Sequence, residues 1–253
     1  MKIAVLYGGV SKEREVSISS SKGVIEALKK NGHDVVAIDF HPERLHEVID
    51  LKVDLVFIAL HGKFGEDGSV QGLLDMLNIP YVGSGVLASA LAMDKYKAKQ
   101  MFNSVDIPTA KGKLYQITED TNIEEINNDI KENFEVPFVI KPNREGSTVG
   151  LTIVKNMDQI EDAIKRATES DSYILVEQFI KGKELTVPVL GKKNEEKALP
   201  IIEIIPKNEL YDYESKYSQG GSEHIIPARI SEELTEKIKK YAVLAHQVLG
   251  CET

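Results

Sequence analysis

The sequence has little of what secreted and membrane proteins need. Its 253 residues contain one cysteine, Cys251, which cannot form a disulfide within the chain. Structural disulfides are typical of oxidising compartments, so a single thiol favours the reducing cytoplasm. No apolar run approaches the roughly 20 residues of a membrane-spanning helix, and Met1 and Lys2 lead directly into an apolar strand instead of a signal peptide. The sequence therefore predicts a cytoplasmic protein with no membrane as partner.

Basic charge is also scarce. The chain has 31 Lys and Arg residues against 40 Asp and Glu residues, which gives a formal net charge of -9 at pH 7. Nucleic acids and anionic membranes attract basic surfaces, so this balance argues against either of them as the main partner. An acidic protein that binds an anionic ligand has to gather its lysines locally.

Two common nucleotide-binding loops are missing. Gly8-Gly9 is not part of a GxGxxG pattern, so a dinucleotide site is not supported, and no Gly-Lys-Ser/Thr motif opens a helix. The segment 139–154 carries a different pattern. An apolar strand ends at Lys141, a loop of small polar residues with Gly146 and Gly150 follows, and a second apolar strand leaves it.

The loop after Lys141 suits an anion. Its glycines allow backbone conformations that a side chain would forbid, so backbone N–H groups and the hydroxyls of Ser147 and Thr148 can turn inward together. Lys141 adds a positive charge at the base of the loop. The pattern predicts that Lys141, Ser147 and Thr148 contact a nucleotide phosphate. An ordinary hairpin with a glycine-containing loop is the alternative.

A second pattern suits the base and ribose of a nucleotide. A strand over residues 173–180 and a strand over residues 185–190 are joined by a short polar bend. Free backbone groups at such a bend can hold an adenine, and a carboxylate a few residues on can reach the ribose hydroxyls. The predicted contacts are Glu177, Gln178, Ile180 and Glu184. For Glu184 alone, a plain surface position is the alternative.

The first third of the chain has the pattern of a doubly wound α/β domain. Strands are expected over residues 3–9, 33–40 and 55–60, and a helix is expected over residues 19–30. Strand, helix and strand in this order imply a right-handed crossover and a parallel sheet, in which ligands lie beyond the carboxyl ends of the strands. Glu13 and His61 fall at that edge. A structural role is the alternative for His61.

Three regions are predicted. Residues 1–93 form the doubly wound domain, and residues 94–180 form a small α+β unit with helices near 94–104, 121–133 and 157–169. Residues 181–253 begin a second sheet, with strands over 185–190 and 198–205 and a helix over 231–249. Between them, residues 207–224 are polar and glycine-containing, which favours a mobile flap, with a half-buried strand as the alternative.

A series of motifs resembles the D-alanine–D-alanine ligases. The motifs lie at residues 8–9, 13–17, 59–62, 65–68, 83–85, 93–95, 141–150 and 211–217, and they follow one another in the order of that family. The resemblance implies an α/β protein: a doubly wound parallel sheet followed by an ATP-grasp module of two α+β subdomains. It also implies ATP and Mg²⁺, a homodimer, and a cytoplasmic ligase that joins two D-alanines for peptidoglycan and cell-wall synthesis, on which cell shape depends.

The resemblance assigns roles to single residues. Lys95 and Lys141 are expected to hold the α- and β-phosphates of ATP, and Lys216 the γ-phosphate.

On the substrate side, the resemblance implies that Glu13 binds the ammonium of the first D-alanine and that His61 lies near its carboxylate. Glu13, Ser147 and Tyr217 are expected to form a hydrogen-bonded lock. Tyr217 also matches the members that form dipeptides and not depsipeptides.

The magnesium ligands of the family match no residue of this sequence, because the stretch that carries them would follow residue 253. The sequence therefore predicts no metal ligand in this chain and an incomplete second ATP-grasp subdomain. Two alternatives to an active ligase remain open. One is a non-catalytic nucleotide-binding fragment. The other is a different ATP-grasp carboxylate–amine ligase, against which Glu13 and Lys216-Tyr217 count.

Overall fold

The computed structural model describes residues 1–191, 194–207 and 220–252, which form two compact units. The first unit comprises Met1–Ala92 with Leu249–Thr253, and the second comprises Met93–Val248. The last residues of the chain thus belong with the first unit. The predicted three-region division, with its boundary near residue 180, stays a prediction.

The first unit is built on a four-stranded parallel sheet with the strand order β2-β1-β3-β4. The strands are β1 (Lys2–Gly8), β2 (Asp34–Phe40), β3 (Leu55–Ile58) and β4 (Tyr81–Val82). Leu6 pairs with Ile58 and Gly8 pairs with Phe40, so neighbouring strands end at a common edge. The central strand β1 is a continuous apolar run, as expected for a strand that is covered on both faces. The predicted parallel sheet is confirmed.

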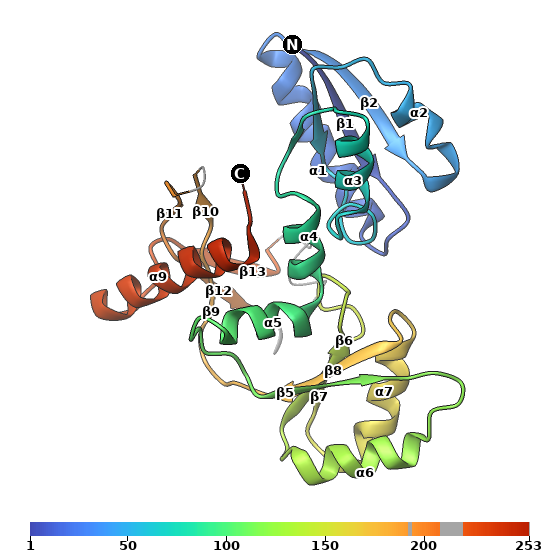
Figure 1. Cartoon of the computed structure of the whole chain (residues 1–253). Coiled ribbons are helices and arrows are strands. Elements are labelled where there is room, and N and C mark those ends of the chain that lie inside the picture. Colours follow the sequence, from blue (N-terminus) through green and yellow to red (C-terminus); the bar gives the residue numbers. More distant parts are fainter. Residues whose placement is uncertain (192–193, 208–219, 253) are drawn as a thin grey trace. The chain divides into compact units, whose positions relative to one another are not determined.

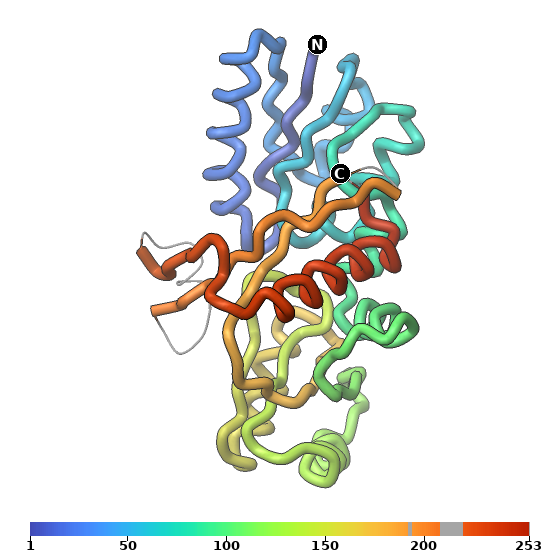
Figure 2. Tube along the Cα trace, turned by 90° about the vertical axis from the view of Figure 1, so that its left-hand side faces the viewer, coloured from blue at the N-terminus to red at the C-terminus, as the bar shows by residue number. Residues whose placement is uncertain are grey.

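Helices and short turns connect these strands. They are α1 (Arg14–Lys30), the 3-10 turn η1 (Pro42–Arg44), α2 (His46–Ile49), α3 (Ser69–Met76) and α4 (Val86–Met93). Helix α1 runs alongside β1 and β2, as Figure 2 shows. The apolar core of this unit includes Leu6, Phe40, Val56 and Leu74.

Helix α1 begins earlier than the sequence predicted. It starts at Arg14, whereas the expected start was near residue 19. The reason is Ser17, which is buried although it is polar. Its hydroxyl accepts a hydrogen bond from the Gly8 backbone N–H at 2.8 Å and donates one to the Ala59 carbonyl at 2.6 Å. The polar residues before residue 19 suggested a loop. In the structure they form the first helical turn and pack against the strand ends.

The second unit begins with helix α5 (Lys95–Asn103) and a four-stranded antiparallel sheet of order β5-β8-β6-β7. Its strands are β5 (Gly112–Gln116), β6 (Phe138–Pro142), β7 (Thr152–Val154) and β8 (Tyr173–Gln178). Helices α6 (Ile123–Asn133) and α7 (Ile160–Thr168), the latter preceded by the 3-10 turn η2 (Met157–Gln159), cover one face (Figure 1). Phe138, Ile140, Ile174 and Val176 fill the core beneath them.

Alternation along the strands sends a different set of side chains to the opposite face. Val139 pairs with Glu177 and with Ile153, and Lys141 lies two residues further along β6. Lys141 and Glu177 therefore share the sheet face that α6 and α7 leave uncovered.

The rest of the second unit holds two smaller sheets and one long helix. One sheet is three-stranded, with β9 (Glu184–Thr186), β12 (Ile202–Pro206) and β13 (Ser222–Ile225), and the other pairs β10 (Val189–Leu190) with β11 (Lys197–Ala198). Helix α9 (Glu232–Leu249) matches its prediction closely.

The predicted strands over 185–190 and 198–205 were wrong in one respect, because each is split between two sheets. The breaks fall at Pro188 and Pro200, which lack the N–H group that would continue a ladder. In the described part of the chain, no helix is long and apolar enough to cross a membrane.

Candidate functional site

The carboxyl edge of the parallel sheet brings Glu13 and His61 close together. Glu13, just before α1, is buried, and its backbone N–H donates to the Ser11 hydroxyl at 3.1 Å. That hydroxyl donates to the His61 carbonyl at 2.7 Å. Gly62 has a φ of +65°, and a Cβ there would lie 3.3 Å from Oε2 of Glu13. A glycine thus lets the loop after β3 approach the Glu13 carboxylate.

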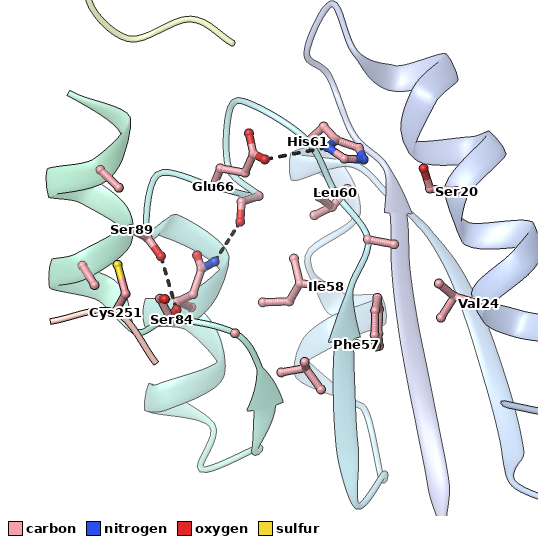
Figure 3. A pocket seen from close by; sticks show the side chains of 17 residues that line it. Ser20, Val24, Phe57, Ile58, Leu60, His61, Glu66, Ser84, Ser89 and Cys251 are labelled. Carbon is pink, nitrogen blue, oxygen red and sulfur yellow. Dashed lines mark hydrogen bonds and ion pairs between the residues drawn. The ribbon is translucent and has the colours of Figure 1, made fainter. Parts of the chain in front are cut away.

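His61 also has an acidic neighbour, which lies in the motif at residues 65–68 but for which no role of its own was predicted. Nδ1 of His61 lies 3.7 Å from Oε1 of Glu66, and Oε2 of Glu66 accepts the Gly62 N–H at 2.7 Å (Figure 3). The Glu66 carboxylate raises the pKa of His61, with burial opposing it and Glu13 adding to it. Burial acts to raise the pKa of Glu66, but His61 and the Gly62 N–H outweigh it and lower that pKa. Two carboxylates and a protonatable imidazole suit a small zwitterion.

A cavity of about 500 Å³ opens beside His61 and Glu66. Figure 3 shows Ser20 and Val24 of α1 on one side and Ser84, Ser89 and Cys251 on the other. The Ser89 hydroxyl donates to the Ser84 carbonyl at 3.2 Å. The cavity thus lies where ligands of doubly wound sheets bind.

In the second unit, lysines from α5 and β6 gather around Glu177. Lys141 forms a salt bridge with Oε1 of Glu177, and Lys99 donates to Oε2 at 2.6 Å. Lys95 lies nearby, and its Nζ donates to the carbonyls of Asn143 and Glu145 at 3.2 Å and 2.5 Å. The predicted residues Lys95, Lys141 and Glu177 do come together, whereas Lys99 was missed. Its spacing of four residues from Lys95 on one helix was the available signal.

The electrostatics of this lysine cluster favour an anion. Burial, followed by the charge of Lys141, lowers the pKa of Lys95 to about 8. Burial acts against the Glu177 carboxylate, but the charges and hydrogen bonds of Lys141 and Lys99 outweigh it and lower the Glu177 pKa. Lys99 and Lys141 share the single charge of Glu177, which leaves positive charge that a phosphate would neutralise.

The predicted phosphate loop connects β6 to β7 as an antiparallel hairpin. Its left-handed residues include Ser147 at φ +48°, Thr148 at +64° and Gly150 at +70°. For Ser147 and Thr148 this conformation is strained, which is common at ligand-binding loops. A Cβ at Gly150 would lie 2.8 Å from Cγ of Pro142, so glycine is needed there for space as well.

The base of this loop is anchored by two residues of the motif at 141–150 for which no role of their own was predicted. The buried Asn143 accepts the Tyr96 N–H at its Oδ1 and donates its own N–H to the Tyr173 carbonyl, both at 2.9 Å. The Arg144 guanidinium donates two hydrogen bonds to Asp171, at 2.6 and 3.0 Å, and the Arg144 backbone N–H donates a third at 2.9 Å. The anchors hold strand ends that are distant in sequence.

A second cavity of about 850 Å³ lies at the bend between β8 and β9. Phe179, Ile180 and Glu184 line one side, and Glu203 and Ile204 of β12 line another. Of the predicted base-binding residues, Ile180 and Glu184 thus face this cavity, while Gln178 is exposed at the end of β8. Ile153 lines the cavity and also belongs to the sheet face that carries Lys141 and Glu177.

Glu203 is already paired and does not offer a metal site. Its carboxylate accepts hydrogen bonds from Arg229 at 3.0 Å and from Lys183 at 2.9 Å. These contacts, with Arg229 the larger, lower the Glu203 pKa to about 2. Among the residues described, no group of three or more His, Cys, Asp or Glu side chains is placed to hold a metal ion. The implied Mg²⁺ therefore does not fit the described residues.

Two predicted site residues, Lys216 and Tyr217, lie outside the described residues, as does most of the predicted flap. Their roles at the γ-phosphate and in the lock with Glu13 and Ser147 stay predictions.

Comparisons with known proteins decide the family. A family model described as "D-ala D-ala ligase C-terminus" matches residues 101–253, and one described as "D-ala D-ala ligase N-terminus" matches residues 2–48 and 43–84. The chain belongs to the D-alanine–D-alanine ligase family. The resemblance found in the sequence motifs is thereby confirmed.

Individual members of the ligase family agree over nearly the whole chain. The D-alanine–D-alanine ligase of Halalkalibacterium halodurans is 57% identical over 253 residues, which are 100% of this chain and 81% of that protein. The D-alanine–D-alanine ligase of Bacillus anthracis complexed with ATP superposes with a TM-score of 0.79 at 34% identity, covering 100% of this chain and 79% of that one. The VanG D-Ala:D-Ser ligase of Enterococcus faecalis gives 0.80 at 33%, covering 99% and 83%. These neighbours confirm the predicted fold class.

Proposed function

We propose that this protein is an ATP-dependent ligase that joins two D-alanines through an acyl phosphate, for the synthesis of peptidoglycan precursors. The observation that carries the proposal is the cluster of half-buried lysines Lys95, Lys99 and Lys141, together with a cavity large enough for a nucleotide base, in a member of a ligase family. The second unit is then the nucleotide side of the reaction, and the first unit is the substrate side.

The chemistry has two steps. A carboxylate oxygen of the first D-alanine attacks the γ-phosphorus of ATP, and the bond to ADP breaks. The amine of the second D-alanine then attacks the acyl phosphate carbonyl, and phosphate leaves with the bonding pair while the nitrogen loses its proton. Phosphoryl transfer depends mainly on positioning and charge neutralisation. Lys95 and Lys141 supply positive charge for the phosphates.

The phosphate loop has a second task. An acyl phosphate is hydrolysed by water, so the site has to exclude water while the amine arrives. In the proposal, Ser147 and Thr148 close over the phosphates on a loop whose base is held by Asn143 and Arg144. Because the base is held and the backbone strain lies at Ser147 and Thr148, we expect movement only at the tip of the loop.

On the substrate side, Glu13 receives the ammonium of the first D-alanine and His61 lies near its carboxylate. The raised pKa of His61 supports this role, because an imidazolium attracts a carboxylate. Glu66 favours the charged form of His61. The Glu13–Ser147–Tyr217 lock belongs to the same proposal.

A homodimer completes the proposal. The reaction consumes ATP, which supports the cytoplasm as the place where the protein works. Helix α4 is almost wholly apolar, yet Val86 and Leu87 are exposed, as are Val82 and Met76 on neighbouring elements. The proposal places these exposed apolar side chains in the interface, where apolar surface is commonly buried. Light scattering should report a dimer, and Leu87→Glu should shift it toward monomer, while a wild-type monomer would contradict this part.

The activity test is phosphate release from ATP with Mg²⁺ and D-alanine, with the product identified by mass spectrometry. The proposal expects D-alanyl-D-alanine and one phosphate per peptide bond, with L-alanine inactive. D-serine and D-lactate as second substrates separate the dipeptide and depsipeptide readings. Binding of ATP without D-alanine-dependent phosphate release would favour the non-catalytic alternative, and turnover with another carboxylate would favour a different ligase.

A further inference from the structure

Lys99 is a half-buried charged residue of the lysine cluster, and the proposed function assigns it no role of its own. It lies one turn after Lys95 on α5, so both side chains leave the same face of the helix. The Lys99 side chain is 14% exposed, as is that of Glu177, to which its Nζ donates at 2.6 Å. A lysine is rarely buried without a partner that compensates its desolvation. Glu177 is that partner.

The same ammonium group also binds the backbone. Nζ of Lys99 donates to the Ala110 carbonyl at 2.5 Å, in the segment between α5 and β5. One residue further, the Lys111 carbonyl accepts the N–H of Gln178 at 2.9 Å. Lys99 therefore ties the connecting segment to the end of β8, where the nucleotide bend begins.

Glu177 divides its two oxygens between two lysines. Lys99 takes Oε2, and Lys141 takes Oε1. A carboxylate that is partly neutralised by one ammonium attracts a second one less strongly than a free carboxylate would. Without Lys99, the full charge of Glu177 would act on Lys141 and hold it away from any other anion.

We infer that Lys99 is a positioning residue of the proposed nucleotide site: it occupies one oxygen of Glu177, so that Lys141 can exchange the other for a nucleotide phosphate. The inference rests on the proposed function and deepens it. Glu177 is then a counter-ion that a phosphate replaces. The role also accounts for a third half-buried lysine in addition to the two that were assigned to phosphates.

The test is calorimetric titration of ATP and of adenosine into the wild type and into Lys99→Met. The expected result is roughly tenfold weaker ATP binding, which is about 1.4 kcal/mol, with adenosine affinity unchanged within about twofold. Lys99→Gln, which keeps a donor for Ala110 without the charge, should weaken ATP binding equally. Lys99→Arg should restore most of it. Lys97→Met, an exposed lysine of the same helix, is the matched control and should bind ATP normally.

A double-mutant cycle with Glu177→Gln separates positioning from simple loss of charge. If Lys99 acts through Glu177, Lys99→Met should weaken ATP binding far less in the Glu177→Gln background than in the wild type. Equal losses of ATP and adenosine, an unchanged ATP affinity, or the same loss in both backgrounds would each overturn the inference. A wild-type chain that binds no ATP would instead overturn the nucleotide site itself.

Discussion

The two units solve opposite electrostatic problems. At the sheet edge of the first unit, the carboxylates of Glu13 and Glu66 act on the His61 imidazole. In the second unit, Lys99 and Lys141 pair with Glu177, and Lys95 lies nearby. The first arrangement suits an ammonium group and the second suits phosphates. The excess of acidic over basic residues in the whole chain therefore says nothing about either site, because a few buried side chains set the local charge.

The two sites are also built differently. The first lies where parallel strands end, so the backbone topology alone brings Glu13 and His61 to one edge. The second depends on side chains that leave a helix and two antiparallel strands and meet over one sheet face. A substitution in the second unit is therefore expected to change ATP affinity, and a substitution in the first unit is expected to change D-alanine affinity.

The largest effect is expected from Lys141→Met. Loss of one charge-assisted contact costs about 1.5–3 kcal/mol, so ATP should bind roughly 10- to 200-fold more weakly, while D-alanine affinity is unchanged. Calorimetry with a non-hydrolysable ATP analogue measures this. Lys113→Met is the matched control, because Lys113 lies on the same sheet but pairs with Asp129 at the surface. Normal nucleotide affinity in folded Lys141→Met protein would contradict the assignment.

Glu13→Gln tests the other unit. The amide keeps a hydrogen-bond acceptor but loses the charge, so D-alanine should bind on the order of tenfold more weakly and ATP should bind normally. Titration of each ligand separately gives both numbers. The exposed neighbour Glu15→Gln should change neither. If Glu13→Gln weakened ATP binding and spared D-alanine, the comparison between the units would be reversed.

A change of pH should alter ATP affinity less than Lys141→Met does. Because the pKa of Lys95 is about 8, its ammonium is present near neutral pH and is lost as the pH rises through that value. ATP affinity should fall several-fold between about pH 7.5 and about pH 9, and binding there should take up a proton. Lys95→Arg stays charged and should abolish both effects, so a pH dependence that survives in Lys95→Arg would assign it to another group.

The lowered pKa of Lys95 also makes the free energy of unfolding depend on pH. The folded-state pKa of Lys95 lies below its ordinary value of 10.5, so between these values the unfolded chain binds more protons. The contribution of Lys95 to stability therefore rises with pH across this window.

The smallest effect is expected at His61. Glu66→Gln removes the carboxylate that raises the His61 pKa, so that pKa should fall, as an NMR titration of the imidazole would show. The pair stabilises the fold above the usual Glu66 pKa and loses that contribution as the pH rises through the folded-state pKa of His61. A His61 titration unchanged by Glu66→Gln would remove the proposed reason for its charge.

Much of this architecture could be predicted from local patterns. The apolar run of β1, the helical spacing of α9 and the strand that ends at Lys141 are each written in consecutive residues, because side-chain periodicity is a local property. The same holds for Glu13 and His61, which topology carries to one edge. The breaks in the two split strands also had a local signal, which is the proline at 188 and at 200. The apolar residues on both sides of each proline favoured one continuous strand.

The sequence by itself determined the leading strand, helix and strand of the first unit, the parallel sheet and the residues available for each half of the proposed site. Only the tertiary structure decided which charges meet. Lys141 and Glu177 are 36 residues apart and Lys99 and Glu177 are 78 apart, so no local pattern links them. Their pairing follows from strand register and from burial, which forces each charge to find a partner. The start of α1 was decided in the same way, because Ser17 is satisfied by two strands that fold against it.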